Sequence, residues 1–441
     1  MRVPRVVRLL RRAWASDVVS LLTPLRRRDF ALLWSGMAVS LVGDGIYFVA
    51  IAWQSYELAN APTTLSLVGM AWSLPMVISL LLGGVLSDRY DRRRLICAAA
   101  LTQGIAIAVV GVLATAGDLK LWALLSLVAV YGAAQGAFTP AFEALVPTLV
   151  APDELLDACA LDQLGRPLAL QLIGPATGGV LIALGGTGLA FLTDAVTSLI
   201  AGTAILSLRA RPAQRRADSL PTAVSDVVVG LRYVLANRWL WGTLAAAALT
   251  LVAFVGPSEV LLPFLIKNEL HAGSGALGAV RALGGVGAVC GALTVGRGGL
   301  PTRFVTVMFV SWSLKCLGLA AYGLTVGEWS FALVAFFSGA MGALGNVVWG
   351  VMMKRHVPNE LLGRVSSLDW LVSIGLVPLS FALTGPLAQA LGVRTLLVVA
   401  GVTGAFTMLV FMRLPGVTDP ERHELELENF SLRFLLPGHD V

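Results

Sequence analysis

Charged residues are scarce in this chain. Of its 441 residues 13% are charged and 57% are hydrophobic, whereas a soluble domain carries about 25% charged residues. Apolar runs of about 20 residues, the length at which a helix spans a bilayer, recur along the whole sequence. The scarcity of charge therefore excludes a soluble globular protein and indicates an all-α integral membrane protein.

Residue patterns that carry enzyme chemistry are also missing. The four cysteines have neither paired nor metal-type spacing, which predicts packing roles without disulfides. The four histidines form no metal-binding or acyltransferase pattern, and the sequence lacks the Gly-Lys-Ser/Thr phosphate loop of ATP-driven proteins. We therefore expect no enzyme activity, no cofactor, no metal and no use of ATP.

The basic N-terminus lacks the apolar core of a signal peptide. Arg8, Arg11 and Arg12 interrupt the stretch where 7–15 apolar residues would be needed. Residues 1–29 are expected to form a basic cytoplasmic segment, either amphipathic on the inner membrane face or a disordered tail. The net charge of +6 comes from arginines gathered in particular loops, so it indicates membrane orientation and not nucleic-acid binding.

Twelve membrane-spanning helices are predicted. The predicted outer loops hold only Lys120, Lys267 and Arg394, whereas the inner segments are rich in arginine and lysine. Because positive residues stay on the inner side, both termini are predicted to be cytoplasmic in a bacterial inner membrane. The predicted spans are 30–57, 64–87, 95–117, 119–146, 158–185, 188–208, 239–266, 273–296, 303–325, 329–353, 364–391 and 393–414.

The two halves of the chain repeat each other. Pro-Asp-Glu-Leu-Leu at 152–156 precedes the fifth span and Pro-Asn-Glu-Leu-Leu at 358–362 precedes the eleventh; an aspartate and a Gly-Pro follow each motif. A repeat of six spans predicts two six-helix halves in parallel orientation, which rock around a site at the bilayer midplane. The predicted domains are a basic segment (1–29), an N-terminal bundle (30–208), a cytoplasmic linker (209–238) with a short amphipathic helix around 224–235, a C-terminal bundle (239–414) and a cytoplasmic tail (415–441).

The short loop between the second and third spans carries a recognisable motif. It matches five of the six fixed positions of the Gly-x-x-x-Asp-Arg-x-Gly-Arg-Arg signature: Gly84, Asp88, Arg89, Arg92 and Arg93. Asp91 stands where the signature has glycine. The loop thus resembles that of the major facilitator superfamily. The resemblance implies a cytoplasmic gate in which Glu143, at the inner end of the fourth span, pairs with Arg92; Asp369, one turn inside the eleventh span, is a further gate candidate.

The fifth span contains the small-residue motif Gly174-Pro175-Ala176-Thr177-Gly178-Gly179. Its Gly-Pro interrupts the helical hydrogen bonds and its closely spaced glycines let another helix approach. The motif is similar to the core Gly-Pro-x-x-Gly-Gly of proton-coupled exporters, although ordinary helix packing is an alternative. The first span resembles that of the family of enterobactin-type siderophore exporters and macrolide efflux proteins.

Charged side chains inside the spans are functional candidates, because placing a charge in the membrane without a partner costs free energy. Asp44 lies about 14 residues into the first span, roughly 21 Å deep at 1.5 Å per residue. We interpret it as a proton-coupling carboxylate, with a helix-packing aspartate as the alternative. Two polar stripes at helical spacing suggest a substrate cavity: Ser40, Tyr47 and Gln54 on the first span, and Tyr131, Gln135 and Thr139 on the fourth.

Glu259 in the seventh span and Arg281 in the eighth are expected at similar depth. They form either a gate or proton switch, or a permanent structural pair. Asp162 and Arg166 are four residues apart and are expected to bond locally. Asp194 and Lys315 fall on the sixth and ninth spans, which are usually peripheral in this architecture, so packing roles are favoured for them.

Three functions fit these features: a secondary active exporter of amphipathic drugs, antibiotics or siderophores by proton antiport, an uptake permease of the same fold, or a lipid-moving or non-transporting membrane protein. The motif of the fifth span favours export, and the buried charges favour transport over a scaffold. The expected partners are a small-molecule substrate, protons and the lipid bilayer, without nucleic acid, and the expected state is a monomer.

Overall fold

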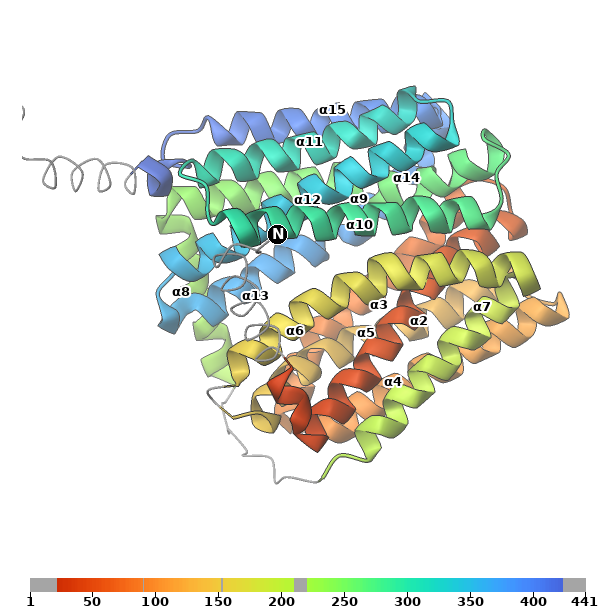
Figure 1. Cartoon of the computed structure of the whole chain (residues 1–441), viewed down its shortest axis with the longest axis horizontal. Coiled ribbons are helices and arrows are strands. Elements are labelled where there is room, and N and C mark those ends of the chain that lie inside the picture. Colours follow the sequence, from red (N-terminus) through yellow and green to blue (C-terminus); the bar gives the residue numbers. More distant parts are fainter. Residues whose placement is uncertain (1–21, 90, 152–153, 210–219, 423–441) are drawn as a thin grey trace, which may run out of the picture. The chain divides into compact units, whose positions relative to one another are not determined.

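Figure 1 shows the computed structural model, which describes residues 22–89, 91–151, 154–209 and 220–422; in these ranges all regular structure is helical. A 3₁₀ turn, η1 (Thr23–Arg26), precedes the first long helix, and a π-helix, η2 (Leu168–Ile173), follows α6. The α-helices are α2 (Arg28–Leu58), α3 (Pro62–Arg89), α4 (Arg92–Ala116), α5 (Leu121–Leu149), α6 (Leu155–Pro167), α7 (Gly174–Leu206), α8 (Leu220–Ala236), α9 (Arg238–Asn268), α10 (Ser274–Gly298), α11 (Phe304–Leu324), α12 (Glu328–His356), α13 (Asn359–Gly375), α14 (Val377–Leu391) and α15 (Val393–Met412).

The described part of the chain contains eleven helical stretches that are long and apolar enough to cross a membrane. The longest, Gly165–Leu206, has 42 residues, about twice what one crossing needs. It is interrupted at Gly185 and Gly186, where Gly186 has φ +75° and ψ 179°, a conformation that essentially only glycine adopts. The stretch therefore holds two crossings, and the total agrees with the twelve spans and the all-α membrane fold expected from the sequence.

The fifth span is built from three segments because two prolines interrupt its hydrogen bonding. Pro167 ends α6 and Pro175 lies in the first turn of α7, and neither has an N–H to donate. Between them the chain widens into the π-helix η2, in which the N–H of Gly174 bonds to the carbonyl of Ala169. The expected break at Gly174-Pro175 is therefore found just ahead of the motif.

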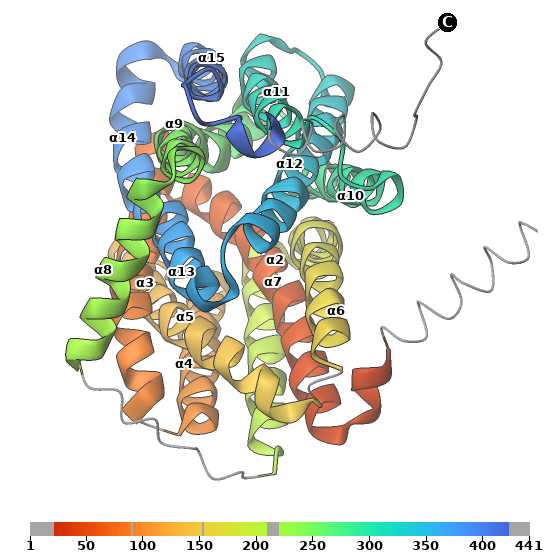
Figure 2. The ribbon, with the colours of Figure 1, turned by 90° about the vertical axis from the view of Figure 1, so that its left-hand side faces the viewer.

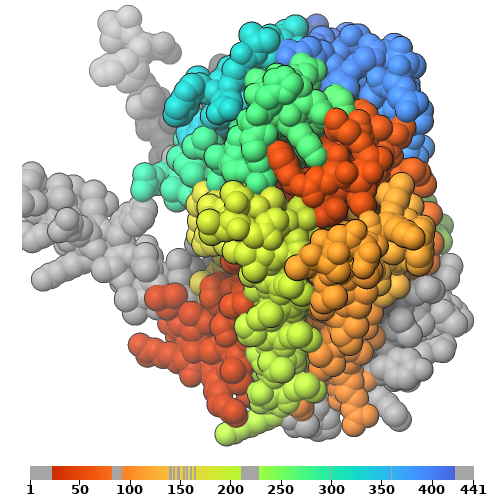
Figure 3. Space-filling model, turned by 90° about the vertical axis from the view of Figure 1, so that its right-hand side faces the viewer, coloured from red at the N-terminus to blue at the C-terminus, as the bar shows by residue number. Residues whose placement is uncertain are grey.

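The first of two compact units comprises residues 1–58, 71–217 and 273–282. In this unit α7 packs against both α2 and α4. Figure 3 shows the yellow-green residues of α7 beside the orange residues of α4. Its hydrophobic core includes Phe30, Leu33 and Ile96, all at most 1% exposed. The close packing of α2 on α7 decides which side chains meet in the candidate site.

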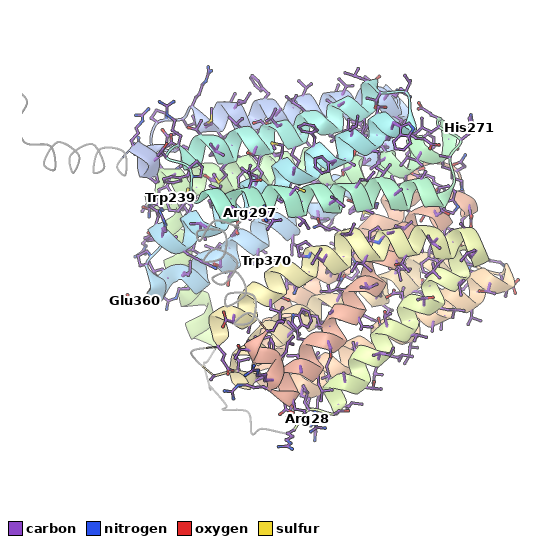
Figure 4. The ribbon with its side chains drawn as sticks, in the orientation of Figure 1. Arg28, Trp239, His271, Arg297, Glu360 and Trp370 are labelled. Atoms are coloured by element: carbon purple, nitrogen blue, oxygen red, sulfur yellow. The ribbon has the colours of Figure 1, made fainter. Side chains whose placement is uncertain are left out.

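The second unit comprises residues 59–70, 218–272 and 283–441. Here α11 packs against α12 and α15, and α9 packs against α14 and α15. The helix α8, which covers the expected amphipathic stretch of the linker, lies alongside α13 (Figure 2). Trp239, Arg297 and Glu360 lie at one end of this unit and His271 at the other (Figure 4). The domain boundaries given above stay a prediction.

Large apolar side chains also cover the outside of the helices. Leu184 is 77% exposed and Val326 81%, which is unfavourable in water but suits contact with lipid. Trp122 and Trp329, at the starts of α5 and α12, are 70% and 85% exposed. Tryptophan is typical of the boundary between lipid and water, so these two residues suit helix ends at a membrane surface.

Candidate functional site

Asp44 on α2 and Tyr131 on α5 are bonded to each other in the first unit. The Tyr131 hydroxyl donates to Asp44 Oδ1 at 2.6 Å. The ring of Tyr47, one helical turn after Asp44, stacks on the Tyr131 ring with centroids 4.6 Å apart. Both tyrosines are 1% exposed. All three residues were candidates on the sequence alone, and the structure brings them together as a buried polar cluster.

Asp194 on α7 approaches the same cluster. Its side chain is fully buried, and it lies against Gly43, the residue before Asp44: a Cβ at Gly43 would overlap both the Asp194 carboxyl and the Thr197 hydroxyl. The sequence interpretation gave Asp194 a packing role. That role stays a prediction; the structure adds that a glycine on the facing span leaves room for the Asp194 carboxyl.

The other residues of the two polar stripes have partners of their own. Thr187 donates to Gln54, and Trp72 Nε1 donates to Gln135 Oε1 at 2.8 Å. Ser40 is partly exposed, and the side chain of Thr139 lies outside the described part. The substrate cavity therefore stays a prediction.

The signature loop is described in part. The side chains of Gly84, Asp88, Arg89, Arg92 and Glu143 lie outside the described residues, so the gate formed by Asp88, Arg92 and Glu143 stays a prediction.

Two residues next to that predicted gate have clear structural roles. Arg93 Nε donates to the Ile205 carbonyl at 3.1 Å, and a cation at the C-terminus of α7 is favourable there. Asp91 has φ −61° and its carboxylate accepts from the Arg94 N–H at 3.1 Å. The aspartate that replaces the signature glycine thus caps the N-terminus of α4, and no left-handed backbone is needed.

The second unit holds three further candidates. Asp369 accepts a hydrogen bond from Trp349 Nε1 on α12 at 3.2 Å. Lys315 lies 4.8 Å from the centre of the Phe254 ring on α9, the helix that also carries Glu259. Since Glu259 belongs to the second unit and Arg281 to the first, their pairing stays a prediction.

The glycines of the Gly-Pro-x-x-Gly-Gly motif are points of close helix approach in the first unit. A Cβ at Gly174 would lie 2.6 Å from the Gly45 Cα, and one at Gly178 would lie 3.0 Å from the Ile46 Cα. A Cβ at Gly179 would lie 3.0 Å from the carbonyl of Ser274, at the start of α10. The motif therefore lets the backbones of α2 and α10 reach the fifth span. Within the described residues, no group of three or more His, Cys, Asp or Glu side chains is placed to hold a metal ion.

A family model described as transmembrane secretion effector matches residues 19–430. The chain belongs to this family of the major facilitator superfamily. The enterobactin exporter EntS of Citrobacter koseri is 28% identical over 350 residues, which cover 77% of this chain and 80% of the exporter. Macrolide efflux protein A of Streptococcus pyogenes is 24% identical over 379 residues, which cover 84% of this chain and 92% of the efflux protein.

Solved structures show the same fold. The nucleoside transporter NupG superposes with a TM-score of 0.65 at 14% identity, covering 87% of this chain and 99% of NupG. A bacterial homologue of the iron transporter ferroportin, in its inward-facing state, gives a TM-score of 0.64 at 17% identity, covering 88% of this chain and 99% of the homologue. The protein is therefore a multi-pass membrane transporter of this superfamily and not an enzyme.

Proposed function

We propose that the protein is a secondary active exporter that moves a partly apolar small molecule out of the cytosol in exchange for protons. The observation that carries the proposal is the carboxyl of Asp44, which lies within a membrane-spanning helix and is bonded to Tyr131 at 2.6 Å. A carboxyl in a membrane interior changes charge only by gaining or losing a proton, which is the chemistry a proton antiporter needs.

Export is supported by the relatives. The named relatives are an enterobactin exporter and a macrolide efflux protein, and both names describe movement of a sizeable organic molecule out of a cell. The Gly-Pro-x-x-Gly-Gly motif, which resembles that of proton-coupled exporters, packs the fifth span closely on α2, the helix that carries Asp44. In the proposal, a proton bound at Asp44 therefore lies on the same helix as the packed surface that alternating access has to rearrange.

The proposal also covers the assembly state, the membrane, the substrate and the driving force. The protein acts as a monomer in a bacterial inner membrane with both termini in the cytoplasm. Its substrate is an amphipathic drug, antibiotic or siderophore taken from the cytosol or the inner leaflet, where apolar surface is preferentially held. Its driving force is the proton gradient, without a cofactor or nucleic acid as partner.

The test is accumulation of ethidium and erythromycin in cells that overproduce the protein. We expect these cells to accumulate less of at least one compound than cells that produce the Asp44→Asn variant in equal amount. An uncoupler that collapses the proton gradient should abolish the difference, because it removes the driving force. Export that survives both the uncoupler and Asp44→Asn would contradict proton antiport through this residue.

The competing functions predict other results. Faster energised uptake of a polar nutrient, with unchanged ethidium and erythromycin accumulation, would support an uptake permease. Competition of a labelled phospholipid with the transported compound in proteoliposomes would support a lipid-moving protein.

A further inference from the structure

Only one of the two carboxyl oxygens of Asp194 has a hydrogen-bond partner in the described structure. Its side chain is 0% exposed, its Oδ1 is 3.4 Å from the Thr197 hydroxyl, and its Oδ2 is buried without a hydrogen-bond partner in the described structure. An ionised carboxylate in a membrane span with an unpartnered oxygen is costly. An apolar side chain would fill the same space at lower cost, so packing alone does not account for Asp194.

The surroundings of Asp194 supply a second carboxyl and no bonded cation. From α2, Gly43 contacts the Asp194 carboxyl, and Asp44 follows in the chain and repels it electrostatically. The Tyr131 hydroxyl of α5 donates to Asp44, and the ring of Tyr47 on α2 stacks on the Tyr131 ring.

The other helices that pack nearby bring no ion pair to the two aspartates. From α6, Arg166 attracts Asp44, but its ion pair is with Asp162, at 3.4 Å. From α4, the thiol of Cys97 bonds to the Gly202 carbonyl at 3.9 Å. Among the described residues neither Asp44 nor Asp194 forms an ion pair.

We propose that Asp194 and Asp44 form one two-carboxyl proton site, in which the proton resides on Asp194 and the negative charge on Asp44 in the state described. Two neighbouring carboxylates without a cation are not both ionised at neutral pH, because like charges repel strongly at low dielectric. The Tyr131 hydroxyl donates to Asp44 and stabilises the charged form there. No donor reaches Asp194 Oδ2 in the described structure, so Asp194 is the carboxyl that keeps the proton.

The site offers a simple transfer step, which rests on the proposed proton antiport. When the contact between α2 and α7 rearranges, the O–H bond of Asp194 breaks and an O–H bond forms on Asp44, while the negative charge passes from Asp44 to Asp194. No oxidant or co-reactant takes part. Asp44 then releases its proton to water on one side of the membrane as Asp194 takes up a proton from the other side, so the two carboxyls are not both ionised and the starting state is restored.

The first test is infrared spectroscopy of the purified full-length protein at pH 7 with a chelator present. The C=O stretching band of a protonated carboxyl should be present in the wild type, shift in D₂O and disappear in Asp194→Asn. It should persist in Asp44→Asn and in Thr197→Val, a control on the same surface of α7 that retains the carboxyl. A wild-type spectrum without a D₂O-sensitive carboxyl band, or the same band in Asp194→Asn, would overturn the proposal. The infrared band is measured without transport, so this test gives a result even if the proposed export fails.

The second test is ethidium transport in proteoliposomes with and without a pH gradient. Asp194→Asn should reduce stimulation by the gradient at least about fivefold, the lower range of energetic coupling between sites. Exchange of ethidium without a gradient should remain.

The double variant Asp44→Asn/Asp194→Asn should be no worse than either single variant, because both residues serve one site. A wild-type response to the gradient in Asp194→Asn, with wild-type export intact, would overturn the inference while leaving the proposed function standing. Effects of the two substitutions that add independently would overturn it as well.

Discussion

At the scale of single residues, Asp44 depends on one hydrogen bond from another helix. The Tyr131 hydroxyl is 2.6 Å from Asp44 Oδ1, and stacking of Tyr47 on the Tyr131 ring holds that hydroxyl in place. A hydrogen bond to a charged group contributes about 1.5–3 kcal/mol. Tyr131 is therefore a positioning residue whose hydroxyl decides where the negative charge resides.

Tyr131→Phe removes this hydroxyl and leaves the stacked ring in place. We expect gradient-driven ethidium export to fall about tenfold, which corresponds to 1.4 kcal/mol, while the amount of protein in the membrane stays unchanged. The matched control is Ser126→Ala on the same helix, because the Ser126 hydroxyl bonds only to the carbonyl of Trp122 in its own helix. Equal loss of export in both variants would contradict a specific role for the Tyr131 hydroxyl.

At the scale of helices, the contact between α2 and the fifth span depends on glycine. Gly45 and Gly174 face each other so closely that a Cβ on either would lie within 2.8 Å of the other's Cα. Two residues before Gly45, on a different side of α2, Gly43 lies against Asp194, which belongs to the crossing that follows the break at Gly186. The exporter-like motif and Asp194 therefore contact α2 through the two separate crossings of residues 165–206.

Gly174→Ala should lower the midpoint of thermal unfolding of the detergent-purified protein. The added Cβ would lie 2.6 Å from the Gly45 Cα and from the Val42 carbonyl oxygen, and backbone atoms cannot rotate away. Overpacking of this kind costs about 1–3 kcal/mol, more than the helix propensity gained on replacing glycine. The control Gly296→Ala has no atom within 4 Å of the new Cβ and should not be destabilised. Equal unfolding midpoints in both variants would contradict this prediction, because the two helices would then accommodate the added Cβ without loss of stability.

At the scale of the whole molecule, the bilayer decides which residues are exposed. The outer surfaces of the helices are apolar, with Leu184 77% and Val326 81% exposed, and arginines gather in the segments predicted to face the cytoplasm. The apolar surface follows from the transfer of side chains from water to lipid, and the placement of the arginines follows the positive-inside rule. The orientation of the termini follows from the second pattern alone and stays a prediction.

Single cysteines in a version without the four native cysteines test that orientation. Cysteines at Asp118 and Glu328 should react in intact cells with a thiol reagent that does not cross the membrane, because both lie in predicted outer loops. Cysteines at Ser207 and Glu360 should react only after the cells are opened. All four positions are exposed in the structure, so burial does not protect any of them. Labelling of Glu360→Cys in intact cells would reverse the orientation.

The sequence by itself determined the membrane fold and its family. The length of the apolar runs, the charge of the loops and the Gly-Asp-Arg-Arg motif are local properties of the sequence. Each can be recognised without knowing which segments pack together. The same local reading found Asp44, Tyr47 and Tyr131, because helical spacing places polar residues of one helix on a common face. The predicted spans 158–185 and 188–208 also lie on either side of the break that the structure shows at Gly185 and Gly186.

Only the tertiary structure decided which polar groups meet. The bond between Asp44 and Tyr131, the contact of Asp194 with Gly43 and the capping of α4 by Asp91 depend on the rotation, depth and backbone conformation of particular segments. Helical periodicity places residues on one face of a helix, but it does not say which neighbouring helix that face meets. The sequence therefore predicted only a packing role for Asp194, whereas the structure buries its carboxyl against Gly43, the residue before Asp44 in the chain.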